Sequence, residues 1–352
     1  MKVMALNSSP RVGNGSKTEM LLNPLIEGMR EAGAEVEVVN LKDLKIKLCL
    51  GCFTCWSKTP GRCVLKDDMT ELLPRFLSCD LAVLASPLYH FTVNAAMKAF
   101  IERTLPAIEP FLRRKDGKTY HPLRGRHPGI IALSVAGFPE DSVFSQLSSY
   151  MRFMYRKGLL AEVYRPGAET LAEPYFKDRL ASIQDAARQA GRELASTGAI
   201  SPGALAMITE PIEGVEDILE AVNLGWQACI EAQVTPKEFS AKGLKPRPTS
   251  LETFMTITKL GFTPGTTDHA RSVIQFIFSG NVSGGCYFVI DKGEIGASLG
   301  RPQEADLTVR ADFDDWMNVF TGAVGSEELL GQGQAQVSGD PALLRLLQGS
   351  RA

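Results

Sequence analysis

The sequence predicts an α/β domain with a parallel sheet covered by helices on both faces, followed by a smaller α+β domain. From the start to about residue 200, short β-branched runs alternate with stretches of helical apolar periodicity. Beyond Ser201 the pattern changes to a helical stretch, a proline-rich segment and closely spaced strands. A length of 352 residues, 44% of them hydrophobic, is enough for two cores.

The elements expected in the first domain follow one another as in a doubly wound sheet. Strands are predicted at residues 2–6, 34–41, 80–86, 129–135 and 159–164. Helices are predicted at residues 16–32, 93–105, 141–157 and 176–196. Five parallel strands with these crossovers suit a flavodoxin-like order, in which ligands bind outside the carboxyl ends of the strands. We therefore expect functional residues in the loops after the first, third and fourth strands.

The rest of the chain predicts a linker and a small α+β domain. Further elements are expected as a helix at 215–231, a linker at 234–250, a helix at 268–278, a hairpin at 285–300, and strand–helix pairs at 306–322 and 333–348. The hairpin turn is placed at Asp291, Lys292 and Gly293. Asp312 and Asp340 are the expected helix N-caps, the latter followed by Pro341 at the first helical position. The predicted divisions are residues 1–200, 201–249 and 250–352.

The composition of the chain limits the classes of molecule that the protein is expected to bind. The formal net charge is −2 with no long run of one sign, so neither a nucleic-acid groove nor a polybasic membrane anchor is expected. No apolar run approaches the roughly 20 residues that span a bilayer, and the N-terminus does not read as a signal peptide. We expect a cytoplasmic protein, in which thiols stay reduced.

The loop after the first strand has the composition of an anion site. The stretch LNSSPRVGNGSKT, residues 6–18, offers small residues, hydroxyls, amides at a helix start, and the cations Arg11 and Lys17. It fits neither the dinucleotide fingerprint nor the ATP-type P-loop, so a simpler phosphate is favoured. A capped polar turn without a ligand is the alternative.

Two further loops extend this predicted site. The third strand runs into Pro87, Leu88, Tyr89 and His90, which would offer a flat ligand a surface for stacking. The fourth strand is followed by Gly137, where the absence of a side chain lets the backbone approach a ring edge. The three loops together predict a pocket for a phosphate at one end and a flat ring at the other.

Four of the seven cysteines lie in one short stretch, IKLCLGCFTCWSKTPGRC. They are Cys49, Cys52, Cys55 and Cys63. In a reducing compartment, such a cluster indicates metal binding or redox chemistry rather than a structural disulfide. Structural zinc and free or disulfide-forming thiols stay open, because tetrahedral Cys₄ zinc sites use similar spacings.

Residues 1 to about 196 resemble the iron–sulfur flavoprotein branch of the flavodoxin-like NADPH-dependent FMN reductase family. The resemblance rests on SSPRVGNGSKT, the cysteine stretch followed by DDM, and SPLYHFTVNAAMKAFIERT. It implies bound FMN, with the phosphate near Ser9, Arg11, Ser16, Lys17 and Thr18 and the isoalloxazine near Pro87, Leu88, Tyr89, His90 and Gly137. The family's usual glycine before the first serine is Ser8 here, which could tighten the turn.

The same resemblance implies further groups and partners. It implies a [4Fe–4S] cluster held by Cys49, Cys52, Cys55 and Cys63, whose Cys₄ set suits such a centre. It also implies NAD(P)H or a ferredoxin-like protein as electron donor, a small-molecule acceptor, and a homo-oligomer. A flavin beside a cluster would convert between paired and single electrons.

The C-terminal residues, from about 250 to 348, resemble a sterol-carrier-protein type lipid-binding domain. The resemblance rests on FSGNVSGGCYFVIDKGEIG, PQEADLTVRADFDDWMNVFTG and GQAQVSGDPALLRLLQ. It implies helices on a small sheet around an apolar tunnel that binds a lipid or another hydrophobic molecule. A domain used only for packing is the alternative, with Trp316, Met317 and Phe320 filling its core.

These observations favour an FMN-dependent oxidoreductase or electron-transfer flavoprotein with a [4Fe–4S] cluster and a tail that takes a hydrophobic ligand. One alternative is a cluster-less NAD(P)H-dependent FMN, quinone or nitroaromatic reductase. The non-enzyme alternative is a redox-regulated lipid-binding protein. No residue stands out as a general acid or base.

Overall fold

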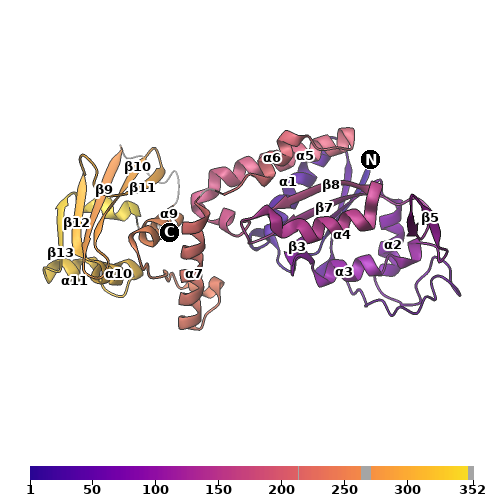
Figure 1. The fold of residues 1–352 in the computed structure, drawn as a ribbon, viewed down its shortest axis with the longest axis horizontal. Helices are drawn as coiled ribbons and strands as arrows, with labels where there is room; N and C mark the ends of the chain where they lie inside the picture. The colour runs from indigo at the N-terminus through magenta and orange to yellow at the C-terminus, as the bar shows by residue number, and fades with distance from the viewer. Residues whose placement is uncertain (213, 263–270, 348–352) are drawn as a thin grey trace. The chain divides into compact units, whose positions relative to one another are not determined.

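The structure is a computed structural model that describes residues 1–212, 214–262 and 271–347. The chain forms two compact units (Figure 1). The first consists of Met1–Ala172 and Asp178–Pro211, and the second of Glu173–Lys177 and Ile212–Ala352. In the described part of the chain, no helix is both long enough and apolar enough to cross a membrane.

The first unit is built on a parallel sheet with the strand order β2-β1-β3-β7-β8. Its strands are β1 (Lys2–Asn7), β2 (Glu35–Asn40), β3 (Leu81–Tyr89), β7 (Gly129–Val135) and β8 (Leu159–Arg165). Taken in chain order, these five strands stand 2-1-3-4-5, which is the flavodoxin-like order expected from the sequence. The predicted fold class of this region is therefore confirmed.

Helices cover both faces of this sheet, and two short hairpins flank it. The helices are α1 (Lys17–Glu31), α2 (Met69–Ser78), α3 (Ala95–Glu102), α4 (Ser145–Tyr155), α5 (Lys177–Thr197) and α6 (Pro202–Thr209). The short strands are β4 (Thr92–Val93), which pairs with β3, and the hairpin of β5 (Arg113–Lys115) and β6 (Lys118–Tyr120). Met4 and Leu6 pack against the apolar side chains of α2, α3 and α4, whereas α1 and α5 cover the opposite face (Figure 1).

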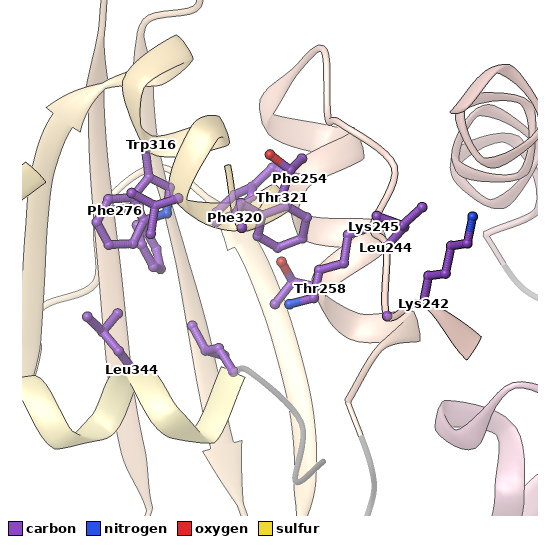
Figure 2. Close-up of a pocket in the computed structure, with 14 residues that line it drawn as sticks. Lys242, Leu244, Lys245, Phe254, Thr258, Phe276, Trp316, Phe320, Thr321 and Leu344 are labelled. Atoms are coloured by element: carbon purple, nitrogen blue, oxygen red, sulfur yellow. The ribbon is translucent and has the colours of Figure 1, made fainter. Parts of the chain in front are cut away.

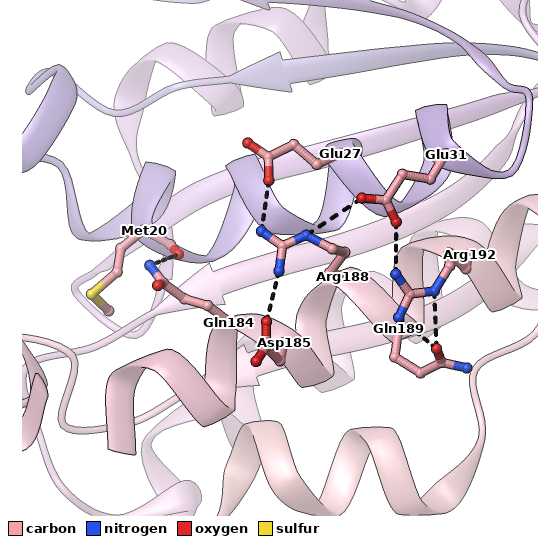
Figure 3. Close-up of polar contacts among 8 residues, drawn as sticks. All are labelled: Met20, Glu27, Glu31, Gln184, Asp185, Arg188, Gln189 and Arg192. Atoms are coloured by element: carbon pink, nitrogen blue, oxygen red, sulfur yellow. Dashed lines mark hydrogen bonds and ion pairs between the residues drawn. The ribbon is translucent and has the colours of Figure 1, made fainter. Parts of the chain in front are cut away.

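Helices α1 and α5 lie unusually close together because glycines stand where they cross. A Cβ atom on Gly28 would lie 1.8 Å from the carbonyl oxygen of Arg188, and one on Gly191 would lie 2.0 Å from that of Leu25. Ion pairs flank this contact (Figure 3): Arg188 pairs with Glu27 at 2.9 Å, and Arg192 with Glu31 at 2.6 Å. The glycines set the helix separation, and the exposed ion pairs add little stability.

The second unit is a five-stranded sheet with helices. Its strands, in the order β11-β10-β9-β12-β13, are β9 (Ser272–Ser279), β10 (Gly284–Asp291), β11 (Glu294–Leu299), β12 (Leu307–Asp312) and β13 (Ala335–Gly339). Its helices are α7 (Val215–Ala232), α8 (Pro236–Ala241), α9 (Leu251–Leu260), α10 (Phe313–Thr321) and α11 (Ser326–Gly331). Phe254, Phe276, Phe288 and Trp316 form the centre of an aromatic-rich core.

Short 3-10 helices occur in both units. They are Gly13–Gly15, Leu41–Asp43, Leu105–Ala107, Asp141–Phe144, Arg156–Gly158, Thr170–Ala172, Pro174–Phe176 and Pro341–Leu347. The last, labelled η8, follows Asp340, whose side chain accepts a hydrogen bond from the Ala342 amide at 2.9 Å. Asp312 caps α10 as predicted, accepting from the Asp314 amide at 2.9 Å.

The helix predicted at residues 268–278 is wrong within the described residues. Positions 268–270 lie outside them, and the rest forms β9, the central strand of the second sheet. Val273, Ile274 and Phe276 are β-branched or aromatic, which favours a strand. Because β9 is buried on both faces, its sequence lacks the alternation of polar and apolar residues that would have identified it.

Candidate functional site

A cavity of about 110 Å³ opens at the carboxyl edge of the first sheet. It gathers all the residues predicted for the flavin except Ser16 and His90, namely Ser9, Arg11, Lys17, Thr18, Pro87, Leu88, Tyr89 and Gly137. The lining also includes Val135, Ala136, Ala168 and Glu169, which the sequence did not single out. The loops after β1, β3 and β7 therefore converge as a flavodoxin-like sheet requires.

Side chains hold the loop after β1 in shape. The Ser9 amide donates to Asn7 Oδ1 at 3.0 Å, and the Arg11 amide donates to Ser9 Oγ at 3.2 Å. Ser16 is the N-cap of α1, with its hydroxyl donating to Ser9 Oγ at 2.9 Å and accepting from the Glu19 amide at 3.2 Å. Ser16 thus does not line the cavity itself but hydrogen-bonds to Ser9, which does.

A buried polar network fastens the three loops to one another. Ser8 donates to the Ala85 carbonyl from both its amide, at 2.9 Å, and its hydroxyl, at 3.1 Å. Asn94 donates to the Ser8 carbonyl at 2.6 Å and accepts from the Met97 amide as the N-cap of α3. Ser134 donates to the Ser86 carbonyl at 2.8 Å. Buried polar groups that are all paired fix geometry, so the serine at position 8 ties the loop to β3.

The cationic end of the cavity is occupied by a carboxylate of the protein itself. Glu169, in the loop after β8, lies 3.1 Å from the guanidinium of Arg11 and 3.5 Å from the ammonium of Lys17. The Lys17 side chain is only 18% exposed, whereas the other two are more than half exposed. Glu169 could have been found from the sequence, because every loop that follows a strand of a parallel sheet begins at this same edge.

The aromatic end is shaped by a strained hairpin turn. His90 and Phe91 connect β3 to β4 with φ values of 47° and 64°. Two consecutive non-glycine residues in the left-handed region are uncommon, and such strain tends to occur at functional sites. The turn leaves Tyr89 and Phe91 each 46% exposed, and the Phe91 ring lies 5.9 Å from that of Phe138 in the loop after β7. This exposed aromatic surface is available for stacking.

Two aspartates and one arginine close the base of the cysteine loop. Arg103 donates to Asp67 at 2.5 and 2.9 Å and to the Lys47 carbonyl at 2.7 Å. Asp67 in turn accepts from the Lys47 amide at 2.8 Å, and Asp68 accepts from the Lys45 amide at 2.6 Å. The Arg103 and Asp67 side chains are 1% and 2% exposed. The aspartates of the DDM motif therefore join the two ends of the loop.

The four cysteines lie in this loop at different depths. Cys55 is buried, Cys49 and Cys63 are half-buried, and Cys52 is exposed. Burial raises the pKa of the Cys55 thiol, and the neighbouring Cys63, Cys49 and Cys52 raise it further. Hydrogen bonding from Thr54 lowers the pKa of Cys52.

Within the described residues, no three histidine, cysteine or acidic side chains are close enough to hold a metal ion. The Cys₄ donor set is chemically suited to a thiolate-ligated cluster or to zinc. The conformation seen here nevertheless does not gather the thiols as either would require.

The other three cysteines are core residues. Cys79, Cys229 and Cys286 are all buried. Burial raises the pKa of Cys286 to about 12, so its thiol stays protonated and is unsuited to nucleophilic chemistry.

A second cavity, of about 480 Å³, lies in the C-terminal unit (Figure 2). Phe254, Phe276, Trp316 and Phe320 contribute aromatic walls. Its size falls in the range of about 300–1,000 Å³ typical of small-molecule sites.

Known proteins resemble the two units separately. Residues 1–159 match the NADPH-dependent FMN reductase family, and residues 265–350 match the SCP-2 sterol transfer family. An iron–sulfur flavoprotein from Archaeoglobus fulgidus is 42% identical over 143 residues, which are 40% of this chain and 58% of that protein. An iron–sulfur flavoprotein from Methanosarcina thermophila is 26% identical over 160 residues, covering 46% and 76%.

A third relative is named as an enzyme. The FMN-dependent NADH:quinone oxidoreductase 2 of Bradyrhizobium diazoefficiens is 26% identical over 165 residues, which are 44% of this chain and 80% of that protein. By contrast, the chain spans only 49 to 59% of three of the archaeal iron–sulfur flavoproteins. Residues 1–159 are thus similar to the NADPH-dependent FMN reductase family, with iron–sulfur flavoproteins among the similar proteins, and residues 265–350 are similar to the SCP-2 sterol transfer family.

Proposed function

We propose that this protein is an FMN-dependent oxidoreductase that uses the cavity at the carboxyl edge of its parallel sheet. The observation that carries the proposal is the lining of that cavity, which brings the cations Arg11 and Lys17 together with the half-exposed ring of Tyr89. Both kinds of residue suit FMN, because this molecule has an anionic phosphate at one end and a flat aromatic ring at the other. Bound FMN would accept hydride and pass electrons on in pairs or singly.

The chain's own residues would bind and orient the cofactor. Arg11 and Lys17 would neutralise the phosphate beside the hydroxyls of Ser9 and Thr18. The backbone at Gly137 would lie against the ring edge, since a Cβ atom there would have only Glu169 nearby, at 3.7 Å. The aromatic side chains after β3 would cover the ring and exclude water. NAD(P)H or a ferredoxin-like protein is proposed as donor, and a quinone-like small molecule as acceptor.

An arginine substitution tests the phosphate assignment. We expect Arg11→Ala to weaken FMN binding by about tenfold, the loss of one charge-assisted contact of roughly 1.4 kcal/mol, and to leave riboflavin binding unchanged. Titration of flavin fluorescence measures both affinities. Arg113→Ala is the control, because Arg113 is similarly exposed, at 63% against 60%, but lies on the β5–β6 hairpin. An equal loss for riboflavin would contradict the phosphate assignment, and absence of flavin binding by the wild type would refute the proposed function.

The cysteine loop is the proposed place of a [4Fe–4S] cluster, supported by its four thiols and by the relatives' names. Analysis of iron, acid-labile sulfide and zinc in protein purified without oxygen distinguishes an iron–sulfur cluster, a structural zinc site and thiols without metal. Iron and sulfide in equal amounts support the cluster, and zinc supports a structural zinc site. The absence of both metals supports a cluster-less reductase.

A second function is favoured by the large cavity of the C-terminal unit. We propose that this cavity binds a hydrophobic molecule, because eight of its fourteen described lining residues are aromatic or aliphatic. Comparison of ligand affinity between oxidised and reduced protein tests the non-enzyme alternative, since equal affinities would exclude redox regulation of binding.

A further inference from the structure

Two neighbouring segments of the first unit concentrate positive charge. The cysteine loop, residues 45–66, holds five lysine or arginine residues and no carboxylate. Residues 109–126, which include the β5–β6 hairpin, hold six such cations and two carboxylates. The two segments together have a formal charge of +9, so the net charge of −2 for the whole chain conceals them. We call the part of the surface that these two segments form the basic surface.

The two segments lie against each other. The Trp56 indole donates a hydrogen bond to the Leu105 carbonyl at 3.1 Å, and its ring lies 4.8 Å from that of His121. A Cβ atom at Gly61 would lie 3.7 Å from the Arg124 side chain. The cations of the two segments therefore share one region of the surface.

These cations are exposed, and most of them lack a carboxylate partner. All eleven are exposed. Within the described part of the chain only two of them form ion pairs, Arg113 with Glu109 at 3.9 Å and Arg126 with Asp80 at 2.7 Å. Like charges close together repel one another, so the basic surface favours a negatively charged partner. A second copy that met it with the same face would add to the repulsion.

Apolar side chains stand among these cations. Four leucines and two phenylalanines of the two segments are at least half exposed: Leu48, Leu50, Phe53, Phe111, Leu112 and Leu123. Phe53 also has a φ of 52°, a left-handed conformation that is strained for a bulky residue. Large apolar side chains grouped on an exposed surface mark a place where another molecule or a membrane binds.

The residue types of the basic surface favour a lipid membrane over a protein partner. Protein interfaces are enriched in tryptophan, tyrosine and arginine, whereas lysine is depleted and leucine is under-represented among the residues that dominate binding. Here the six apolar residues are leucines and phenylalanines, and six of the eleven cations are lysines. Such apolar side chains enter the acyl boundary of a bilayer, while neighbouring cations contact anionic head groups. A nucleic acid would match the charge but not the leucines.

We propose that the basic surface docks the protein on membranes that carry anionic lipids. The leucine and phenylalanine side chains insert between the lipids, and the surrounding lysines and arginines pair with the lipid phosphates. This inference rests on neither the flavin site nor the C-terminal cavity. It follows from the local charge and exposure of two segments of the chain.

The test is co-sedimentation of the full-length protein with vesicles. One set contains phosphatidylcholine with about one-third phosphatidylglycerol, and the other contains phosphatidylcholine alone. We expect the protein to bind the anionic vesicles at least tenfold more tightly. This preference should shrink as the salt concentration is raised from about 0.05 to 0.5 M, because salt screens the charges.

Two double variants separate the role of charge from that of insertion. Arg62→Gln with Arg124→Gln removes one cation from each segment and should weaken binding to anionic vesicles at least tenfold, since each such cation contributes about fivefold. Leu48→Ser with Leu112→Ser should also weaken binding at least tenfold, because serine gains nothing from entering the lipid.

Matched controls remove the same kinds of group elsewhere. Arg30→Gln with Arg192→Gln lowers the charge equally, but on α1 and α5, across the sheet from the core against which Ile46 of the cysteine loop packs. Ile230→Ser removes a side chain that is 68% exposed, as Leu112 is, but from α7, whose sequence has no lysine or arginine. Each control should change vesicle binding by less than about twofold.

Equal binding to both kinds of vesicle, or binding to neither, would overturn the proposal. Wild-type affinity in the leucine variant would also overturn it and would indicate an acidic macromolecule as the partner of the basic surface. Wild-type affinity in the Arg62 and Arg124 variant would overturn the assignment to this surface. Thermal unfolding followed by circular dichroism verifies that each variant is folded, and none of these outcomes depends on flavin binding.

Discussion

At the scale of single residues, Glu169 is the least expected feature of the candidate flavin site. Its carboxylate pairs with the two cations, Arg11 and Lys17, that are proposed to hold the FMN phosphate. A phosphate that enters this end of the cavity must displace the carboxylate or repel it. With FMN bound as proposed, Glu169 would therefore compete with the phosphate for these two cations.

We expect Glu169→Gln to raise the affinity for FMN by about two- to fivefold, because exposed ion pairs contribute up to about 1 kcal/mol and the carboxylate would no longer compete. Fluorescence titration at low and high salt measures this gain, which should shrink as salt screens the charges. Glu140→Gln, another exposed carboxylate after β7, controls for net charge. Weaker binding by the Glu169 variant would instead show that Glu169 orients Arg11 for the phosphate.

At the scale of elements, the cysteine loop depends on a buried ion pair at its base. Burial by itself would raise the pKa of Asp67, but hydrogen bonds from Arg103 and from the Lys47 amide hold it below its usual value. A carboxyl group with a depressed pKa stabilises the fold above its unfolded pKa of about 3.9, and this contribution disappears as the pH falls through the folded-state value. The loop base should therefore open in acid.

Asp67→Asn should lower the free energy of unfolding by about 3–5 kcal/mol, because it leaves the Arg103 guanidinium buried without a counter-charge. Denaturant unfolding measures the loss, and the variant should lack the fall in stability that we expect of the wild type below about pH 4. Asp43→Asn, which removes an exposed pair with Lys42, should cost under about 1 kcal/mol. Equal costs for the two variants would contradict the proposed role of the loop base, and faster labelling of Cys49 and Cys63 in Asp67→Asn would support it.

The close contact between α1 and α5 leads to a second prediction, on the stability of the first unit. Gly191→Ala places a methyl group 2.0 Å from the Leu25 carbonyl oxygen, so the helices must separate. We expect a loss of about 1–3 kcal/mol in unfolding free energy despite alanine's better helix propensity. Gly225→Ala in α7 is the control, since a Cβ atom there meets nothing within 4 Å and the change should be neutral or stabilising.

At the scale of the whole molecule, the two units have separate cores and separate cavities. Among the residues that the structure describes, those that line the candidate flavin site belong to the first unit, and those that line the larger cavity belong to the second. Each ligand should therefore stabilise the unit that binds it.

We expect calorimetry of the full-length protein to show two unfolding transitions. FMN at about 100 times its dissociation constant adds roughly 2.7 kcal/mol to the first unit alone, which raises that midpoint by about 5–10 °C. A hydrophobic ligand of the second cavity should raise only the other midpoint. A single transition that both ligands shift would show that the units unfold as one.

The sequence by itself was enough for the fold class and for most of the residues around the first cavity. Strand–helix alternation specifies a doubly wound sheet, and that topology brings the loops carrying Arg11, Tyr89 and Gly137 to one edge. These inferences succeed because they depend on local periodicity and on one rule of strand order. The same local reasoning failed for β9, where burial on both faces removed the periodic signal.

Only the tertiary structure decided which groups meet across long separations in the chain. Glu169 pairs with Arg11, 158 residues away, and Asp67 reaches Arg103, 36 residues away, to close the cysteine loop. Periodicity encodes which face of an element is buried. The pairing of particular charges depends on packing that no local pattern records.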